Sequence, residues 1–219
     1  MTKIIIFTGL SVSFDEAKEI LDSTDDVEVI YKNPVRRGDV FSSISENPDI
    51  IGIIDGVFHQ SPSVGHKEIM QAIKRDIKVV GSSSMGALRA SELDTLGMTG
   101  IGYVYKQYAE GLITSDDDVA VVFDKDTLEA ISEPLVNMDY AFKEAVKEGI
   151  ISQEDKDELY KTAKDIFYPQ RNYASVLAKR DLSEDKKSKL KEYVKNSVDI
   201  KKEDGLELLR YIKDMIEWI

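Results

Sequence analysis

The chain is organised around the stretch Val79-Val80-Gly81-Ser82-Ser83-Ser84-Met85-Gly86-Ala87-Leu88-Arg89-Ala90. Its two valines predict the end of a buried strand, Gly81 and Gly86 predict a tight turn, and the Ala and Leu residues beyond them favour a helix. A serine hydroxyl at such a turn lies beside the unpaired amides and the positive dipole end of the new helix. The turn can therefore hold a nucleophile or an anion.

Three interpretations of this turn remain open from the residues alone. The first is that a serine only caps the helix. The second is phosphate binding, because the glycine spacing is that of a P-loop, but Ala87 and Leu88 stand where Lys and Ser or Thr would be needed. The third is a nucleophile elbow, in which Ser84 is the nucleophile and the amides of Met85 and Gly86 stabilise an oxyanion.

Composition narrows the chemistry. The chain has 219 residues, 41 acidic and 29 basic side chains and a net charge of -12. No basic stripe with interleaved aromatics is present, which argues against nucleic acid as a partner and favours a basic protein surface. Without cysteine, and with only two histidines, the chain lacks the usual ligands for a thiolate or multi-histidine metal centre. We expect no metal and no cofactor.

Apolar runs alternate with helical patterns in the first half of the chain. Strands are predicted at Lys3–Thr8, Val27–Tyr31, Ile50–Ile54 and Ile77–Val80, and helices at Phe14–Leu21, Asp39–Glu46, His66–Arg75 and Ser84–Leu96. This alternation predicts an α/β fold with a mostly parallel sheet flanked by helices.

The second half of the chain has a different pattern. Val119–Phe123 predicts a further strand, and amphipathic helices are expected from Glu129 onward, forming an integral helical C-terminal layer. We therefore expect an α/β core over residues 1–125 and a helical region over residues 126–219. No apolar run has membrane-spanning length and no signal peptide is recognised, so a cytoplasmic protein without membrane contact is expected.

The parallel sheet predicts which side chains meet at the serine turn. The loop after Ile54, the start of the next helix and the turn itself lie at the carboxyl edge of the sheet. Asp55, His59, His66 and Lys67 are thus expected near Ser84, and Lys67 is the lysine that this geometry selects as a base. Its amine would have to be neutral, which desolvation can achieve. The alternative is an ordinary solvated lysine in the first turn of a helix.

Two further charged groups have open interpretations. Arg89 either forms an ion pair with Glu92, three residues along the same helix, or recognises a carboxylate near the site. We favour the ion pair. The three consecutive aspartates at 116–118 could bind Mg²⁺ or a basic partner, or form a solvated turn.

Several blocks together resemble the TfuA-like proteins over roughly the first 125 residues. They are, in order, Val57-Phe58-His59-Gln60, His66-Lys67-Glu68-Ile69, the stretch from Gly81 to Leu93, Gly97-Met98 and Asp117-Asp118-Val119-Ala120-Val121. The C-terminal helices resemble this family only loosely, apart from Arg171-Asn172-Tyr173.

The resemblance implies a role beside YcaO enzymes, which use ATP to activate a peptide amide oxygen so that sulfur can replace it. It implies that the protein supplies the sulfur by hydrolysing the C-terminal thiocarboxylate of a ThiS-like carrier with a Ser-Lys pair. It also implies a stronger interaction of the YcaO enzyme with its peptide. That peptide is either the methyl-coenzyme M reductase alpha subunit, as for methanogen members, or the precursor of a ribosomally made product.

Carried over to this chain, the resemblance assigns Ser84 as the nucleophile and Lys67 as its base, while the neighbouring Ser82 and Ser83 stay open as the nucleophile. The oxyanion or substrate-binding residues are then Met85, Gly86, Arg89 and His59. A chain without cysteine cannot carry sulfur itself, and a thiolate leaves readily, so a modest Ser-Lys site would suffice.

Two rival functions remain. One is a non-catalytic adaptor that recruits the sulfur carrier and the peptide substrate to the YcaO enzyme. The other is a nucleotide-binding domain, which predicts measurable ATP binding.

Overall fold

The computed structural model describes residues 1–22, 26–58, 61–124 and 130–217. Contacts divide the chain into two compact units, Met1–Thr114 together with Lys201–Ile219, and Ser115–Ile200. The predicted boundary between residues 125 and 126 lies outside the described residues and stays a prediction. We describe each unit by itself.

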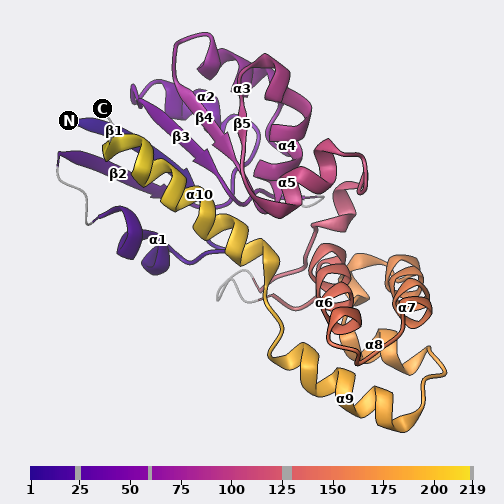
Figure 1. Cartoon of the computed structure of the whole chain (residues 1–219). Helices are drawn as coiled ribbons and strands as arrows, with labels where there is room; N and C mark the ends of the chain where they lie inside the picture. The colour runs from indigo at the N-terminus through magenta and orange to yellow at the C-terminus, as the bar shows by residue number, and fades with distance from the viewer. Residues whose placement is uncertain (23–25, 59–60, 125–129, 218–219) are drawn as a thin grey trace. The chain divides into compact units, whose positions relative to one another are not determined.

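The first unit is built on a five-stranded parallel sheet with the order β2-β1-β3-β4-β5 (Figure 1). Its strands are β1 (Thr2–Phe7), β2 (Val27–Lys32), β3 (Ile50–Ile53), β4 (Lys78–Gly81) and β5 (Thr99–Gly100). The register pairs Ile4 with Ile50 and Ile53 with Gly81. Continuous apolar strands can be buried on both faces, as parallel sheets require. The predicted α/β class is confirmed, and β5 is a strand that the pattern did not predict.

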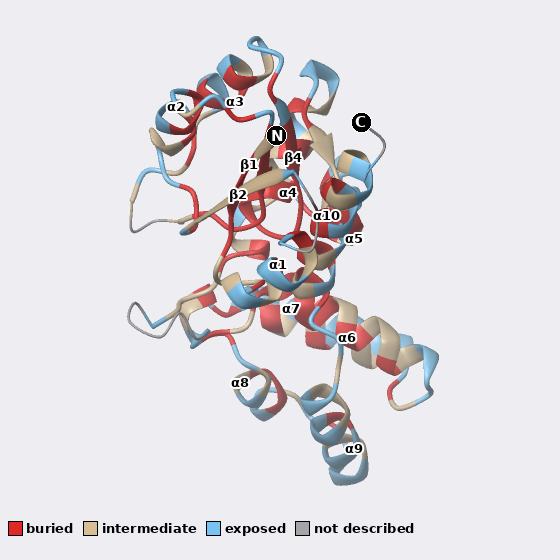
Figure 2. Cartoon of the chain, turned by 90° about the vertical axis from the view of Figure 1, so that its left-hand side faces the viewer, coloured by how far each residue is buried: buried red, intermediate tan, exposed pale blue. Residues whose placement is uncertain are grey.

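Helices cover both faces of this sheet. The first unit contains α1 (Phe14–Leu21), α2 (Asp39–Ile44), α3 (His66–Ile73), α4 (Met85–Leu93), the short η1 (Asp94–Leu96), α5 (Gly102–Ala109) and most of α10 (Ile200–Glu217). One face packs against α1 and α10, and the other against α2, α3 and α4. Buried residues gather in the central strands and on the helix sides that face them, whereas the edge strand β2 is half-buried (Figure 2). Because the helices cover the two faces of the sheet, its carboxyl edge is occupied by the loops that connect strands to helices.

The terminal helix α10 belongs to the first unit. A β-carbon on Gly52 of β3 would lie 3.0 Å from Ile212 and 3.3 Å from Leu208, so the helix packs directly over the strand. Asp204 of α10 also accepts the amides of Tyr103 and Val104, both at 2.7 Å, and so caps the start of α5. Burial raises the pKa of Asp204 to about 7, against the lowering effect of these amides.

The second unit is helical and contains η2 (Asp116–Asp118), α6 (Leu135–Lys147), α7 (Gln153–Asp165), η3 (Tyr168–Gln170), α8 (Tyr173–Ala178) and α9 (Glu184–Lys195). Its apolar core includes Phe142, Leu159 and Leu190. Two predictions were wrong here. Val119–Phe123 forms no strand, since only an isolated bridge joins Phe123 to Ala130. The helix expected from Glu129 begins at Leu135, after Pro134.

Arg171 is fully buried inside the second unit. Its guanidinium donates to the carbonyl oxygens of Ala163 (3.0 Å), Ile166 (3.3 Å) and Asp117 (3.0 Å), and to the Asp117 carboxylate (3.0 Å). Paired and hydrogen-bonded in this way, a buried charge is tolerated. Arg171 thus joins the acidic turn to the end of α7.

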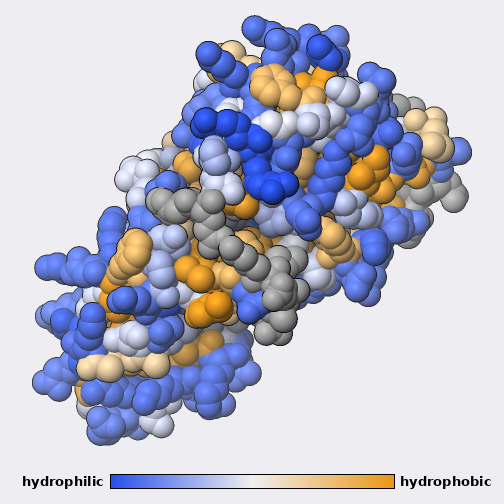
Figure 3. Space-filling model, turned by 180° about the vertical axis from the view of Figure 1, so that it is seen from behind, coloured by the Kyte–Doolittle hydropathy of each residue, from blue (hydrophilic) through white to orange (hydrophobic). Residues whose placement is uncertain are grey.

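The face of the molecule seen in Figure 3 is mostly hydrophilic, with apolar side chains exposed between the hydrophilic ones. Exposed apolar residues such as Phe41, Leu112 and Phe167 come from different elements of the two units. Single exposed apolar residues of this kind are normal on a protein surface. Within the described residues, no helix combines the length and apolar composition needed to cross a bilayer.

Candidate functional site

The serine turn connects β4 to α4 and has an unusual backbone. Ser83 adopts a positive φ of 66°, and the amide of Ser84 donates to the carbonyl of Ser82 at 2.8 Å. This is a three-residue γ-turn of the rare type with positive φ. Such a conformation is strained for a residue with a side chain, and strain of this kind clusters at functional sites.

The three serines of the turn are buried. Ser82 and Ser83 have no exposed surface and Ser84 is 3% exposed. The hydroxyls of Ser82 and Ser83 have no hydrogen-bond partner among the described residues. Leaving a buried hydroxyl unpaired costs about 1–3 kcal/mol, so each calls for an explanation. Ser84 occupies the N-cap position of α4, but its side chain makes no capping hydrogen bond.

The amides at the start of α4 differ in availability. Gly86 N lies 3.4 Å from the carbonyl oxygen of Ile54, which also accepts from Ser84 N at 3.3 Å. The Met85 amide donates to no acceptor in the described part of the chain. Of the two predicted oxyanion donors, Met85 is therefore free and Gly86 is engaged.

Packing of the turn against β3 explains why residue 86 is a glycine. A β-carbon there would overlap the carbonyl oxygen of Ile53 in β3. Only glycine fits here, because the neighbouring strand approaches the backbone this closely. The role of Gly86 in binding an oxyanion stays a prediction.

Lys67 is the second residue of α3 and is exposed. Its amine makes no ion pair or hydrogen bond to a described residue, Ser84 included. The next residue, Glu68, is buried and accepts the amides of Gly65 (3.0 Å) and Gly38 (2.8 Å), which fixes the start of α3. These hydrogen bonds fix the helix that carries Lys67. The pairing of Lys67 with Ser84 stays a prediction.

Arg89 of α4 is engaged in the predicted ion pair, with its Nη1 2.6 Å from Glu92 Oε2. It also donates from Nε to the Val64 carbonyl at 3.0 Å. His66 at the start of α3 contacts the same Glu92 oxygen at 2.8 Å. These contacts tie the helix after the serine turn to the helix that carries Lys67. His59, a predicted binding residue, lies outside the described residues.

Asp55 follows β3, as expected, but its carboxylate is already used. Oδ2 accepts the amides of Leu10 (2.9 Å) and Ser11 (2.8 Å), and Oδ1 accepts the Ser11 hydroxyl (2.7 Å). Asp55 has no exposed surface. It therefore holds the loop after β1 in place.

The acidic turn at 116–118 is also engaged. The Asp117 carboxylate accepts from Arg171 at 3.0 Å and from the Ser115 hydroxyl. Burial acts to raise the pKa of Asp117, but the hydrogen bonds from Ser115 and Arg171 outweigh it and lower that pKa. The pairing with Arg171 balances the charge of the Asp117 carboxylate, so no metal ion or partner protein is needed to explain this aspartate.

Sequence reasoning missed a pocket of about 340 Å³ at the carboxyl ends of β1 and β2. Its lining residues come from positions far apart in the chain, among them Phe14, Tyr31 and Arg36. One signal could have pointed to it, because residues 32–38 contain three basic side chains and no acidic one in a chain of net charge -12.

These features define the class of this protein, a parallel α/β domain with a strained serine turn at the carboxyl edge of its sheet. The chain belongs to the TfuA-like protein family, whose model matches residues 55–172. The match includes the serine turn, Lys67 and Arg171, and it confirms the resemblance found in the sequence. Proteins of this family are associated with YcaO-dependent thioamidation.

Two other comparisons add little. Comparison with curated proteins gives no match. Among solved structures, the RcsB response regulator of Salmonella typhimurium, described in terms of conformational dynamism for DNA interaction, aligns with 10% sequence identity and a TM-score of 0.34. The alignment covers 97% of this chain and 100% of that one. A likeness at this level carries no argument about fold or function.

Proposed function

We propose that this protein hydrolyses the C-terminal thiocarboxylate of a ThiS-like sulfur carrier protein and so releases sulfide for a YcaO enzyme. The observation that carries the proposal is the serine turn, where a strained backbone holds two buried hydroxyls beside the Met85 amide, all three without a hydrogen-bond partner among the described residues. A hydroxyl nucleophile and an oxyanion donor are two of the parts that acyl transfer needs, and a base is the third.

The reaction follows from these parts. A serine hydroxyl attacks the thiocarboxylate carbon, and the Met85 amide donates to the oxyanion of the tetrahedral intermediate. The carbon–sulfur bond then breaks, the serine proton goes by way of the base to the sulfur, and hydrosulfide leaves. Water attacks the resulting acyl-serine, which releases the carrier carboxylate and a proton and regenerates the hydroxyl.

Ser82, Ser83 and Ser84 are all candidates for the nucleophile, and separate observations favour two of them. The pattern Ser84-Met85-Gly86 favours Ser84, as the sequence predicts. The positive φ favours Ser83, because in a nucleophile elbow the nucleophile sits on the strained turn. Lys67 is the proposed base, and its amine, which has no partner among the described residues, would move toward the turn when the carrier tail binds.

Intact-mass measurement of carboxylate formation from thiocarboxylated carrier tests the proposal. Ser82→Ala, Ser83→Ala and Ser84→Ala are compared singly, and the variant that lacks the nucleophile should lose at least about a hundredfold in rate. Lys67→Ala should cause a similar loss. Lys74→Ala is the matched control, since Lys74 is exposed at the other end of α3. Unchanged turnover in all three folded serine variants would refute the hydrolase.

A non-catalytic adaptor is the second candidate. It is favoured by the burial of Ser84 and by the absence of a hydrogen bond between Ser84 and Lys67 in the described residues. Such an adaptor would bring the carrier and the peptide, for instance the methyl-coenzyme M reductase alpha subunit, to the YcaO enzyme. It predicts that the three serine variants stimulate thioamidation as well as the natural protein does.

A further inference from the structure

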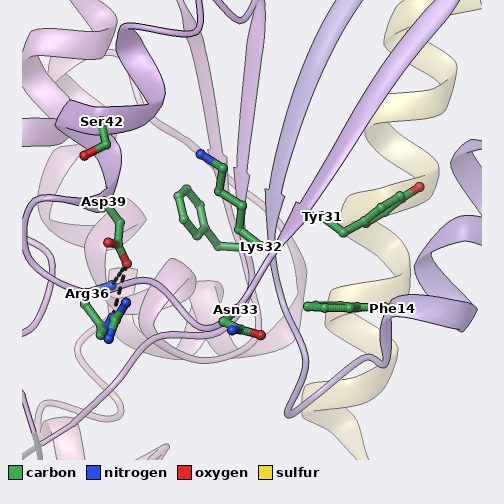
Figure 4. Close-up of a pocket in the computed structure, with 8 residues that line it drawn as sticks. Phe14, Tyr31, Lys32, Asn33, Arg36, Asp39 and Ser42 are labelled. Carbon is green, nitrogen blue, oxygen red and sulfur yellow. Dashed lines mark hydrogen bonds and ion pairs between the residues drawn. The ribbon is translucent and has the colours of Figure 1, made fainter.

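The pocket at the ends of β1 and β2 has two unlike sides (Figure 4). Phe14 and Tyr31 lie on one side, and Arg36, Asp39 and Ser42 lie on the other, with Lys32 and Asn33 between them. The full lining is Phe7, Phe14, Tyr31, Lys32, Asn33, Arg36, Asp39 and Ser42. Its volume of about 340 Å³ is in the range of small-molecule sites.

The aromatic side is held in position by contacts outside the pocket. The rings of Phe14 and Tyr31 have centroids 6.5 Å apart and are tilted by 37°. The Tyr31 hydroxyl donates to Asp22 at 2.7 Å, and burial together with Asp22 raises its pKa, so it stays protonated. With the hydroxyl engaged, the ring offers the pocket an apolar surface.

The polar side offers unused hydrogen-bond donors. The nearest ion-pair contact of Arg36 is from Nε to Asp39 at 3.6 Å, and its two terminal nitrogens have no acceptor among the described residues. The side-chain amide of Asn33 is likewise without a partner in the described part of the chain. A planar guanidinium with free nitrogens binds carboxylate or phosphate in a bidentate way.

The segment that carries these donors is fixed by backbone hydrogen bonds. Val35 N donates to the Asp55 carbonyl at 2.9 Å, Val57 N donates to the Val35 carbonyl at 3.1 Å, and Arg37 N donates to the Pro62 carbonyl at 2.9 Å. Such anchoring lowers the entropic cost of binding a ligand. Lys32 and Arg37 add positive charge to the segment, although Lys32 is paired with Glu46 at 2.5 Å.

We propose that this pocket binds a small aromatic anion, with its ring against Phe14 and Tyr31 and its phosphate or carboxylate on Arg36 and Asn33. A nucleoside monophosphate has this chemistry. The location agrees with the proposal, since α/β sheets bind ligands outside the carboxyl ends of their strands. The site is separate from the serine turn, and its binding does not depend on hydrolysis.

Titration calorimetry with adenosine monophosphate tests the proposal. We expect saturable binding with a Kd below about 1 mM. Adenosine and inorganic phosphate, titrated separately, should each bind at least about tenfold more weakly, because each lacks one half of the ligand. Indole-3-acetate supplies a second aromatic anion, in which a carboxylate replaces the phosphate.

Three variants locate the binding. Arg36→Met and Phe14→Leu should each weaken it at least about tenfold, whereas Arg37→Met, the adjacent arginine outside the lining, should change it by less than about twofold. The proposal fails if neither aromatic anion saturates. It also fails if phosphate alone binds as tightly as the nucleotide, or if Arg36→Met and Arg37→Met have equal effects.

Discussion

The serine turn and the aromatic pocket lie at the same edge of one sheet, yet they are built in opposite ways. The turn is closed, since Ser82 and Ser83 have no exposed surface and the backbone between β4 and α4 is strained. The pocket is open, and the side chain of Arg36 is 61% exposed. Changes at the turn should therefore act on folding and reactivity together, whereas changes at the pocket should act on ligand affinity with little effect on stability.

The largest effect is expected from Gly86→Ala. The new β-carbon would overlap the Ile53 carbonyl oxygen, so strand and helix would have to separate, at a cost above about 4 kcal/mol of unfolding free energy. The control is Gly38→Ala beside the pocket, where φ is +92° and no atom lies within 4 Å of a β-carbon. It should cost only about 1 kcal/mol. Denaturant unfolding followed by circular dichroism measures both, and equal losses would contradict the contrast.

Asp55→Ala should affect both regions, because the backbone at residues 54–55 bonds to both. The carbonyl of Ile54 accepts Ser84 N and that of Asp55 accepts Val35 N. Removing the carboxylate leaves three donors of Leu10 and Ser11 unpaired, which should cost about 3 kcal/mol. Asp49→Ala, which removes one exposed bond to Lys3 N, should cost less than about 1 kcal/mol. Thermal unfolding that shows similar losses for the two variants would rule out this anchoring role.

Asp204 makes the free energy of unfolding of the first unit, which contains both regions, depend on pH. Its pKa is raised to about 7, so between pH about 4 and about 7 the folded chain holds a proton that the unfolded chain has released. This contribution to stability is full at the acidic end and is lost as pH rises through about 7, by an amount on the order of 4 kcal/mol.

Melting curves of the natural chain and Asp204→Asn over this pH range test the contribution. The difference between the two isolates Asp204 from carboxylates such as Glu16, whose pKa is lowered chiefly by its hydrogen bond with Lys202. A difference that stays constant with pH would exclude the effect.

The smallest effect is expected from Ser83→Gly. Glycine adopts the positive φ of this position without strain, so the variant should gain about 0.5–1 kcal/mol. Ser82→Gly is the matched control, because it removes the same kind of buried hydroxyl without a partner among the described residues, while the φ of Ser82 is not positive. A small rise in melting temperature for the first variant alone supports the strained turn. A loss of stability at Ser83 would count against it.

The parts of the fold that follow from local sequence were predictable. A strand such as β3 is buried on both faces and therefore reads as one apolar run. Strand β5 has only two residues, which are too few to show a hydrophobic pattern. Val119–Phe123 is apolar without being a strand, because a strand also needs a neighbour and only one bridge forms there. That α10 joins the first unit could not be read from its amphipathic pattern, which does not specify the surface it covers.

The candidate site likewise has a part that could be predicted from the sequence and a part that could not. Glycine and serine are local turn signals, so the turn itself could be predicted. Which serine takes the positive φ depends on carbonyls of β3, and the sequence does not contain that information. The engagement of Gly86 by Ile54 has the same origin. The pocket combines positions 14, 31 and 36, which only the assembled sheet brings together.

The membership of α10 in the first unit has a consequence for synthesis of the chain. Because residues 201–217 cover Gly52 and its neighbours, the sheet emerges from the ribosome with one apolar face partly bare. It stays so while residues 115–200 are translated, and that segment can become compact first. The unit that carries both sites is thus completed after the helical unit, and until then a chaperone has an apolar surface to bind.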